Sequence, residues 1–159
     1  MEEPASGTVA ASRAFVVRLM VPSDANFMGN VFGGEIMAEV DRVAYITACR
    51  HAGATCVTAS IDRVDFLEPV HVGEVVEFGA QLTYVGHSSM EVAVEVEARP
   101  VSAGGARPVA RAFVTMVAVG PDGRPVAVPP LQLVSDEERR RYEQGHRRSD
   151  ERRRSRSRG

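Results

Sequence analysis

Only one long stretch of this chain has the periodicity of a buried helix, and it directly follows a glycine-rich loop. In residues 34–51, apolar side chains recur at helical spacing at Ile36, Met37, Val40, Val43 and Ala44. A stop is expected near Gly53, because glycine commonly ends a helix. The rest of the fold must therefore be built from other elements packed against this single helix.

The flanking segments are typical of β-strands. Residues 90–98 alternate glutamates with valines, which is a period-two pattern. Further strands are predicted at residues 13–21, 56–66, 75–85 and 109–119, joined by short turns and a Gly- and Ala-rich loop at 101–108. One helix against a mostly antiparallel sheet is an α+β layer arrangement. The pattern alone fits more than one fold of this class.

The loop before the helix, residues 22–34, is the candidate site. It combines turn formers with Gly29, Gly33 and Gly34. Backbone N–H groups of Gly33, Gly34 and Glu35 would be unpaired at the helix start, where they suit a carbonyl oxygen that becomes negative during a reaction. The plainer alternatives are a tight turn at the two glycines and a solvated helix residue at Asp41, which lies two turns into the helix.

Composition predicts one cytoplasmic domain, with 159 residues and 44% hydrophobic content. No apolar run approaches the roughly 18 residues that a membrane helix needs, and the acidic N-terminus does not resemble a secretory signal. Two cysteines without framework spacing are expected to be reduced. We expect residues 1–12 to be disordered, 13–134 to form the domain and 135–146 to form a short helix.

The C-terminus differs in charge from the rest of the chain. From Asp136 onward ten arginines face six acidic residues, whereas the preceding part has nine arginines and fifteen acids. Residues 147–159, rich in Arg and Ser, are expected to be a disordered tail. Without interleaved aromatic residues, weak nonspecific contact is favoured over specific nucleic-acid binding.

The residues limit the available chemistry. No G-x-S-x-G run is present. The four histidines, at positions 51, 71, 87 and 146, have no metal-ligand spacing, so no metal and no cofactor are expected. A carboxylate that activates water, or attacks directly, is the remaining economical choice.

Three ordered blocks resemble one known family. The runs DANFMGNVFGGEIMAEVD, TASIDRVDFLEPVHVGEVVEF and GHSSMEVAVEVEA are similar to the hotdog-fold acyl-CoA thioester hydrolases, in particular the cytosolic long-chain branch. The resemblance covers about residues 15–133. It implies a hotdog fold, in which one long central helix is wrapped by a curved antiparallel sheet of about five strands. It also implies hydrolysis of fatty acyl-CoA, with coenzyme A as part of the substrate.

In that family an Asn in the loop and an Asp fifteen residues later form the catalytic pair. Asn26 and Asp41 occupy these positions here. The resemblance implies that Asp41 is the base or nucleophile and that Asn26 orients water or the thioester. The family builds this pair across a dimer interface, with the amides of Gly33 and Gly34 polarising the carbonyl.

Coenzyme A contacts are also implied by the resemblance. They fall on the turn formed by Gly86, His87, Ser88 and Ser89, and on Arg63 and Asn30. Some relatives carry Asp in place of Asn30, and many carry Arg in place of His87, so the sequence departs from the family at both positions. A plain hairpin turn and a plain loop residue remain the alternatives. Phe32, Met37 and Val40 are candidates to line an apolar tunnel for the acyl chain.

The expected assembly is a homodimer with sites at its interface, assembled further into a hexamer as a trimer of dimers. The first rival function is an acyl-CoA-binding regulatory module without efficient hydrolysis. The second is acyl transfer or hydratase chemistry on the same fold. A hotdog hydratase would pair a His with an Asp, and neither Asn26 nor Asp41 is a His. A role in nucleic-acid binding through the arginine tail ranks last.

Overall fold

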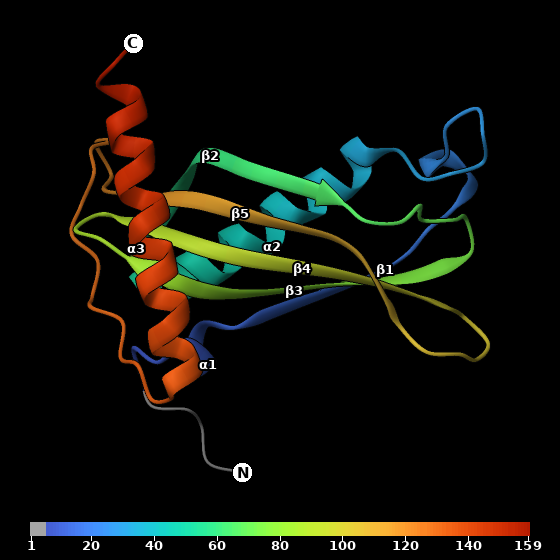
Figure 1. Ribbon diagram of the computed structural model, residues 1–159, viewed down its shortest axis with the longest axis horizontal. Helices are drawn as coiled ribbons and strands as arrows, with labels where there is room; N and C mark the ends of the chain where they lie inside the picture. Colours follow the sequence, from blue (N-terminus) through green and yellow to red (C-terminus); the bar gives the residue numbers. More distant parts are fainter. Residues whose placement is uncertain (1–5) are drawn as a thin grey trace.

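A curved five-stranded antiparallel sheet wraps around one helix (Figure 1). The computed structural model describes residues 6–159. The elements follow in the order α1 (Val9–Ser12), β1 (Ala14–Leu19), a 3-10 turn η1 (Pro22–Asp24), α2 (Gly33–Ala52), β2 (Thr55–Phe66), β3 (Glu74–Val85), β4 (Ser89–Pro100), β5 (Arg107–Val119) and α3 (Asp136–Arg156). The sheet order is β1-β3-β4-β5-β2, so β1 and β2 are its edges. This confirms the α+β hotdog architecture and the predicted strands.

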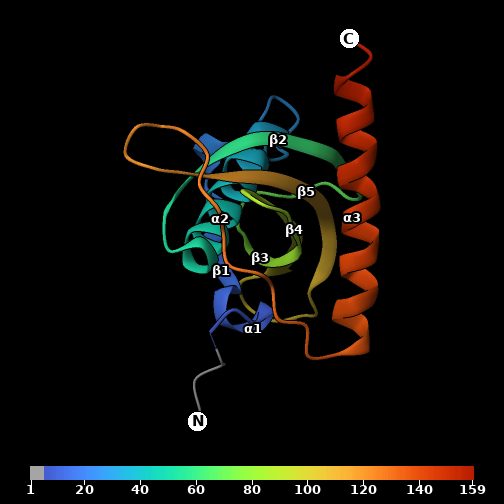
Figure 2. The same cartoon turned by 90° about the vertical axis from the view of Figure 1, so that its left-hand side faces the viewer.

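The core lies between α2 and the concave face of the sheet. Figure 2 shows the sheet curving between α2 on one side and α3 on the other. The buried apolar side chains of α2 are Ile36, Val40, Val43, Ala44 and Ala48. They recur every three or four residues, so they form one stripe that faces the sheet. Helix α2 ends at Gly53, whose φ of 62° is the left-handed conformation that glycine adopts without strain.

The edge strand β2 is irregular. Its pairing with β5 shifts register between Thr58 and Ser60 and again between Asp62 and Asp65. Within the second bulge Arg63 has a φ of 47°, which is unusual for a residue with a side chain. Bulges bend a strand and increase its twist. This bending lets β2 follow the curve of the sheet around α2.

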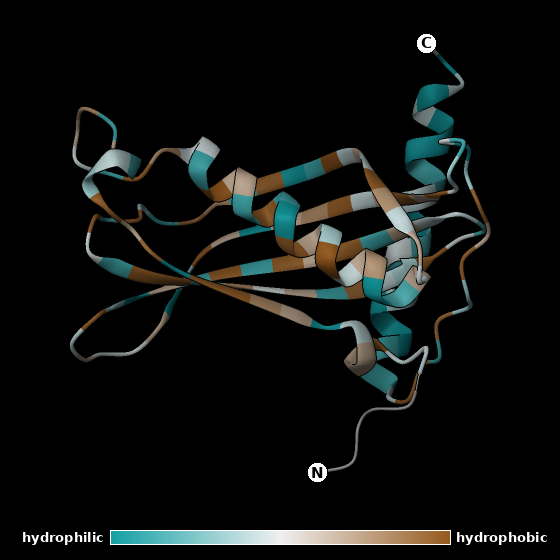
Figure 3. Ribbon diagram, turned by 180° about the vertical axis from the view of Figure 1, so that it is seen from behind, coloured by the Kyte–Doolittle hydropathy of each residue, from teal (hydrophilic) through white to brown (hydrophobic). Residues whose placement is uncertain are grey.

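Helix α3 corrects the predicted C-terminus. The helix has 21 residues and runs to Arg156, so the expectation of a disordered tail from residue 147 is wrong, as is the expected end of the helix at 146. It packs on the outer face of the sheet, opposite α2, and it is almost entirely hydrophilic (Figure 3). A polar helix of this kind needs specific partners on the sheet.

Those partners centre on one buried carboxylate. The Glu91 side chain on β4 is fully buried and accepts hydrogen bonds from Arg148 at 2.7 Å and from Arg152 at 3.1 Å. Thr83 donates to the same carboxylate at 2.7 Å. The Arg148 guanidinium also lies 3.8 Å from the centroid of the Phe113 ring. Tyr142 and His146 of α3 also pack on the buried Tyr84 ring, with centroids 5.0 and 5.1 Å away. Polar contacts and this aromatic packing therefore hold α3 on the sheet.

The predicted disorder of residues 1–12 also needs correction. Residues 1–5 lie outside the described part of the chain. Beyond them, α1 forms at Val9–Ser12 and is capped by the Thr8 side chain, which accepts from the Ala11 amide at 3.3 Å. Val9 is 2% exposed, and the Gln132 amide donates to the Gly7 carbonyl at 2.8 Å. These contacts hold residues 7–12 beside the segment before α3.

Candidate active site

The loop that precedes α2 is held by its own backbone and by Asn26. The Asn26 amide donates to the Asn30 carbonyl at 2.7 Å, and the Asn26 side-chain oxygen accepts from the amides of Met28 at 2.9 Å and Asn30 at 3.2 Å. Gly29 has a φ of 81°, which permits the tight reversal. The side-chain oxygen of Asn26 is thus used within the loop. Its NH2 group has no hydrogen-bond acceptor within residues 6–159 and is left to donate elsewhere.

Helix α2 begins with free amide groups. No side chain caps it at Phe32, and within the described residues the N–H groups of Gly33 and Gly34 have no acceptor. The third amide differs from expectation, because Glu35 donates to the Phe32 carbonyl at 3.0 Å. Free N–H donors at the positive end of a 20-residue helix have the chemistry that suits a developing oxyanion.

Asp41 has a specific partner on the neighbouring strand. The Thr58 hydroxyl of β2 donates to the Asp41 carboxylate at 2.6 Å. Asp41 is partly exposed, and Thr58 lies on the exposed edge of the sheet. The Thr58 bond leaves the second carboxylate oxygen available for water or substrate. Thr58 was not predicted, because an exposed threonine in a strand has no periodic signal that separates it from its neighbours.

Within one chain, Asn26 and Asp41 are not brought together. Asn26 bonds to its own loop and Asp41 bonds to Thr58. Eight residues of helix separate Gly33 from Asp41, which is about 12 Å along the axis. Within one chain the amides and Asn26 therefore lie apart from Asp41 and Thr58, and whether they act together stays a prediction.

The remaining predicted residues fall into separate places. The Asn30 side-chain oxygen lies 3.0 Å from Nδ1 of His71, so Asn30 ties the loop to the segment before β3. Arg63 is exposed and its Nε lies 3.4 Å from Asp65. The turn at residues 86–89 lies at the end of the sheet opposite the loop before α2 (Figure 1). Within residues 6–159 no contact joins these groups to Asp41, and their roles as coenzyme A ligands stay predictions.

The 86–89 turn is more than a simple connection. The Gly86 amide donates to the Ser89 carbonyl at 2.8 Å, as in an ordinary hairpin. The carbonyls of Ser88 and His87 accept from Ala118 and Val128, both at 2.9 Å. The backbone is fixed in this way, and the exposed His87 side chain and the partly exposed serines are free to meet a ligand.

Within residues 6–159, no group of three or more His, Cys, Asp or Glu side chains is arranged to hold a metal ion. No helix in this part of the chain is both long and apolar enough to cross a membrane.

The segment beside Asn30 is also held by an ion pair. Arg107 contacts Glu74 at 2.5 and 3.0 Å, and the His71 amide donates to Glu74 at 2.8 Å. The Arg107 hydrogen bond lowers the pKa of the Glu74 carboxyl below its usual range, against an opposing effect of burial. Since the pKa is lower in the folded state, Glu74 stabilises the fold above its unfolded pKa of about 4.3. That stability is lost as the pH falls through the folded pKa.

Replacing Glu74 by Gln should therefore lower the free energy of unfolding at pH 7 and reduce its decline in acid. The measurement is urea unfolding of wild type and variant at pH 7 and at several values below about pH 4.3. Glu97→Gln is the matched control, because Glu97 is exposed on β4 and has no ion pair in the described chain. Parallel stability curves for wild type and Glu74→Gln would contradict the prediction.

The sequence of this chain matches known proteins of one family. The family model described as the thioesterase superfamily matches residues 28–104. An uncharacterized acyl-CoA thioester hydrolase of Bacillus subtilis is 37% identical over 138 residues, which are 87% of this chain and 80% of that protein. This chain belongs to the acyl-CoA thioester hydrolases. The human cytosolic acyl coenzyme A thioester hydrolase is 36% identical over 89% of this chain, but the chain spans only 38% of its length.

Solved acyl-CoA hydrolases share the whole fold. A hexameric acyl-CoA thioesterase superposes with a TM-score of 0.89 at 39% identity, covering 94% of this chain and 96% of that one. The acyl-CoA hydrolase of Staphylococcus aureus, solved with butyryl coenzyme A and coenzyme A, gives 0.87 at 36% identity, covering 96% and 93%. Structures of the latter also exist with an Asn, an Asp or a Thr replaced by Ala.

Proposed function

We propose that this chain hydrolyses fatty acyl-CoA thioesters to free fatty acid and coenzyme A. The observation that carries the proposal is the pairing of Asp41 with Thr58 at 2.6 Å beside an open sheet edge. A carboxylate held by one hydroxyl keeps its other oxygen free to take a proton from water, or to attack the carbonyl itself. Membership of the acyl-CoA thioester hydrolases supports the substrate class.

The roles follow from these two groups of residues, the helix-start amides with Asn26 and Asp41 with Thr58. The amides of Gly33 and Gly34 donate hydrogen bonds to the thioester oxygen and stabilise the negative charge that develops on it. Asn26 uses its free NH2 group to orient water or the thioester. The residues replaced in the Staphylococcus aureus hydrolase support this set, because its Asp follows its Asn by 15 positions and its Thr follows its Asp by 17. The same spacings separate Asn26, Asp41 and Thr58 here.

A second copy of the chain completes the site. Strand β2 is an edge whose outer N–H and C=O groups are unpaired, and Val57 and Phe66 on it are 48% and 54% exposed. Antiparallel pairing of β2 with β2 of a second copy would cover this edge and carry Asn26 of one copy toward Asp41 of the other. A hexameric relative supports assembly of such dimers into a trimer of dimers, which light scattering of the purified protein tests.

Coenzyme A is proposed to lie against the 86–89 turn, with Arg63 and Asn30 as further contacts. It is part of the substrate, and no separate cofactor is needed for carboxylate-assisted hydrolysis. The mammalian relatives named as cytosolic support a cytoplasmic enzyme. The arginines of α3 are partly used to hold the helix on the sheet, so we propose no specific nucleic-acid partner.

Thiol release from acyl-CoAs tests the activity, and mixed subunits test the shared site. Asp41→Asn and Asn26→Ala are each expected to be nearly inactive. Random reassociation of the two variants makes half of the dimers mixed, and each mixed dimer has one intact site. About a quarter of wild-type activity should therefore return on mixing. No recovery after proven subunit exchange would contradict a shared site. Tight acyl-CoA binding without thiol release from wild type would favour the rival binding module.

A further inference from the structure

Three carboxylates converge on one arginine of β1 at the start of α2. The Arg18 guanidinium contacts Asp24 of η1 at 2.5 Å. It also contacts Glu35 at 3.2 Å and Glu39 at 3.4 Å, both on α2. Asp24 is 4% exposed and Glu39 is 8% exposed, so these contacts differ from solvated ion pairs that contribute little. The cluster joins β1, η1 and α2 at one point.

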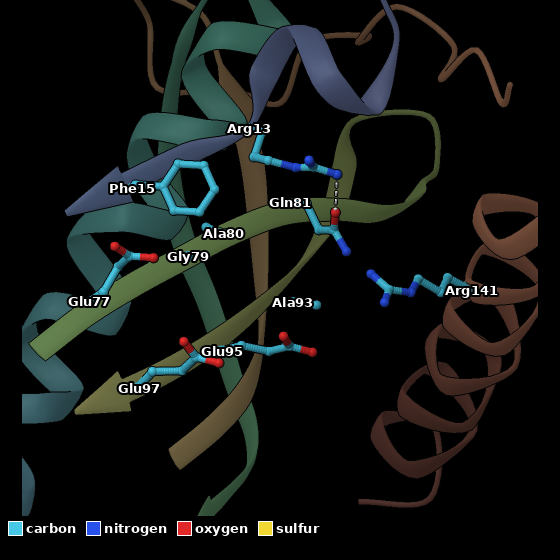
Figure 4. A pocket seen from close by; sticks show the side chains of 10 residues that line it. All are labelled: Arg13, Phe15, Glu77, Gly79, Ala80, Gln81, Ala93, Glu95, Glu97 and Arg141. Atoms are coloured by element: carbon cyan, nitrogen blue, oxygen red, sulfur yellow. Dashed lines mark hydrogen bonds between the residues drawn. The ribbon is translucent and has the colours of Figure 1, made fainter. Parts of the chain in front are cut away.

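The alternation of β1 places Arg18 on the face toward α2. Met20, two positions later on the same face, is 1% exposed, whereas Phe15 on the outer face is 60% exposed. Phe15 lines a hollow of about 350 Å³ on that outer face, where Arg13 donates to the Gln81 side-chain oxygen at 2.8 Å (Figure 4). Of these two arginines of the first strand region, Arg18 is the one that reaches the loop before α2.

Asp24 connects Arg18 to the entry of that loop and to the helix start. Its carboxylate accepts from Arg18 and from the Val21 amide, the latter at 2.8 Å. Its carbonyl accepts from the amide of Phe32, the last residue before α2, at 2.9 Å. Asp24 also lies two positions before Asn26. One carboxylate bound by Arg18 therefore fixes both the approach to Asn26 and the beginning of the helix.

Glu35 ties the other end of the loop to the same guanidinium. Its Oε2 accepts from Nη1 and from Nη2 of Arg18, both at 3.2 Å. A glutamate at this helix position often accepts from the amide that precedes the helix, but that amide here donates to Asp24. Glu35 directly follows Gly34, whose amide is free within the described residues. Arg18 thus bridges Asp24 and Glu35, and the segment between them carries Asn26 and both free amides.

Arg18 also sets the charge beside those amides. Arg42 contacts Glu39 at 2.6 Å, so three carboxylates face two guanidinium groups and the cluster has a net charge of −1. Without Arg18 the net charge would be −2. A carboxylate one residue from Gly34 would then oppose the negative charge that develops on an oxygen held by the amides.

We propose that Arg18 is a positioning residue for acyl-CoA hydrolysis. It fixes Asn26 relative to the free amides of Gly33 and Gly34, and it neutralises Glu35 beside them. This inference rests on the proposed function. Arg18 acts through Asp24 and Glu35 and needs no contact with the substrate. Geometry matters here because a displacement of about 1 Å can cost about a hundredfold in rate.

The test is Arg18→Met, which keeps an unbranched side chain and removes every bond of the guanidinium. The expected result is a kcat that is lower by about tenfold to a hundredfold, with KM for acyl-CoA unchanged. Arg148→Met is the matched control, because it also takes an arginine from a buried carboxylate, that of Glu91, but on the opposite face of the sheet. It should lower the urea midpoint and leave kcat unchanged. A folded Arg18→Met enzyme with wild-type kcat would overturn the inference.

A second variant separates positioning from stability within the cluster. Arg18→Met leaves the buried Asp24 carboxylate without its cation, and Arg18→Met/Asp24→Asn removes that charge. The urea midpoint should recover in the double variant, whereas kcat should stay low because the bridge to Glu35 is still missing. Recovery of kcat together with the midpoint would mean that Arg18 only stabilises the fold, and would overturn the inference.

Hydrogen exchange separates this inference from the proposed function, because it needs no substrate. Residues 25–34 include three amides that are hydrogen-bonded within the loop, those of Met28, Asn30 and Phe32. In Arg18→Met, mass spectrometry should show faster exchange over 25–34 and unchanged exchange over the 86–89 turn. In Arg148→Met, residues 25–34 should exchange as in wild type. Unchanged exchange over 25–34 in a folded Arg18→Met protein would overturn the inference, whether or not the wild type releases thiol.

Discussion

Replacing Asp41 by Asn is expected to lower kcat for acyl-CoA hydrolysis about a hundredfold or more. Asn has the same size and still accepts the hydrogen bond from Thr58, but it cannot take a proton from water or attack as a nucleophile. The hydrogen bond from Thr58, which is 2.6 Å long in the wild type, therefore still orients the side chain, while the negative charge that reacts is removed. The measurement is steady-state thiol release with the best acyl-CoA, with folding checked by circular dichroism.

Thr58→Val is the companion variant, since it keeps the shape of Thr and removes only the hydroxyl. A hydrogen bond to a charged group contributes about 1.5–3 kcal/mol, so a loss of about tenfold or more in kcat is expected, less than for Asp41→Asn. An Asp41→Asn enzyme that keeps more than a tenth of wild-type kcat would exclude Asp41 as the base or nucleophile. A larger loss in Thr58→Val than in Asp41→Asn would instead make the hydroxyl the reacting group.

Removing both cations from the Glu91 carboxylate is expected to destabilise the fold by about 3–5 kcal/mol. In Arg148→Met/Arg152→Met the long side chains still cover the sheet, but a fully buried carboxylate is left with only the Thr83 hydroxyl as a side-chain partner. An uncompensated buried charge is costly, because nothing replaces the water that it lost. Urea unfolding measures the change, and the slope of the unfolding free energy against urea concentration is compared between the variants.

Adding Glu91→Leu to that double variant should recover most of the lost stability, because an apolar group then meets apolar neighbours. Arg153→Met/Arg154→Met is the matched control on the same helix. Both of these arginines are exposed and have no acidic partner in the described chain. Equal urea midpoints for Arg148→Met/Arg152→Met and for this control would mean that the ion pairs do not hold α3 in place.

The sequence-based predictions succeeded where the signal is local. The stripe on α2 and the alternation of Glu91 to Glu97 with valines each specify an element within a few residues. Gly53 marked the helix end for the same reason. The family resemblance then supplied the topology, which alternation alone does not determine.

The predictions failed where the deciding partner lies far along the chain. The α3 segment looks like a solvated arginine tail until Glu91 is placed beneath Arg148 and Arg152, 57 and 61 residues away. Thr58 is similar, because only the fold brings it to Asp41. The packing of a helix on a strand creates both contacts, and composition does not reveal it.

The position of α3 has a consequence for how this protein is made. Arg152 is translated 61 residues after Glu91. At a synthesis rate of roughly 5–20 residues per second, the outer face of β4 therefore stays without α3 for about 3–12 s. During this interval a nascent sheet with an aliphatic residue at position 91 would expose a larger apolar surface to other chains. A glutamate at that position keeps the uncovered strand hydrated until the last helix emerges from the ribosome and neutralises its charge.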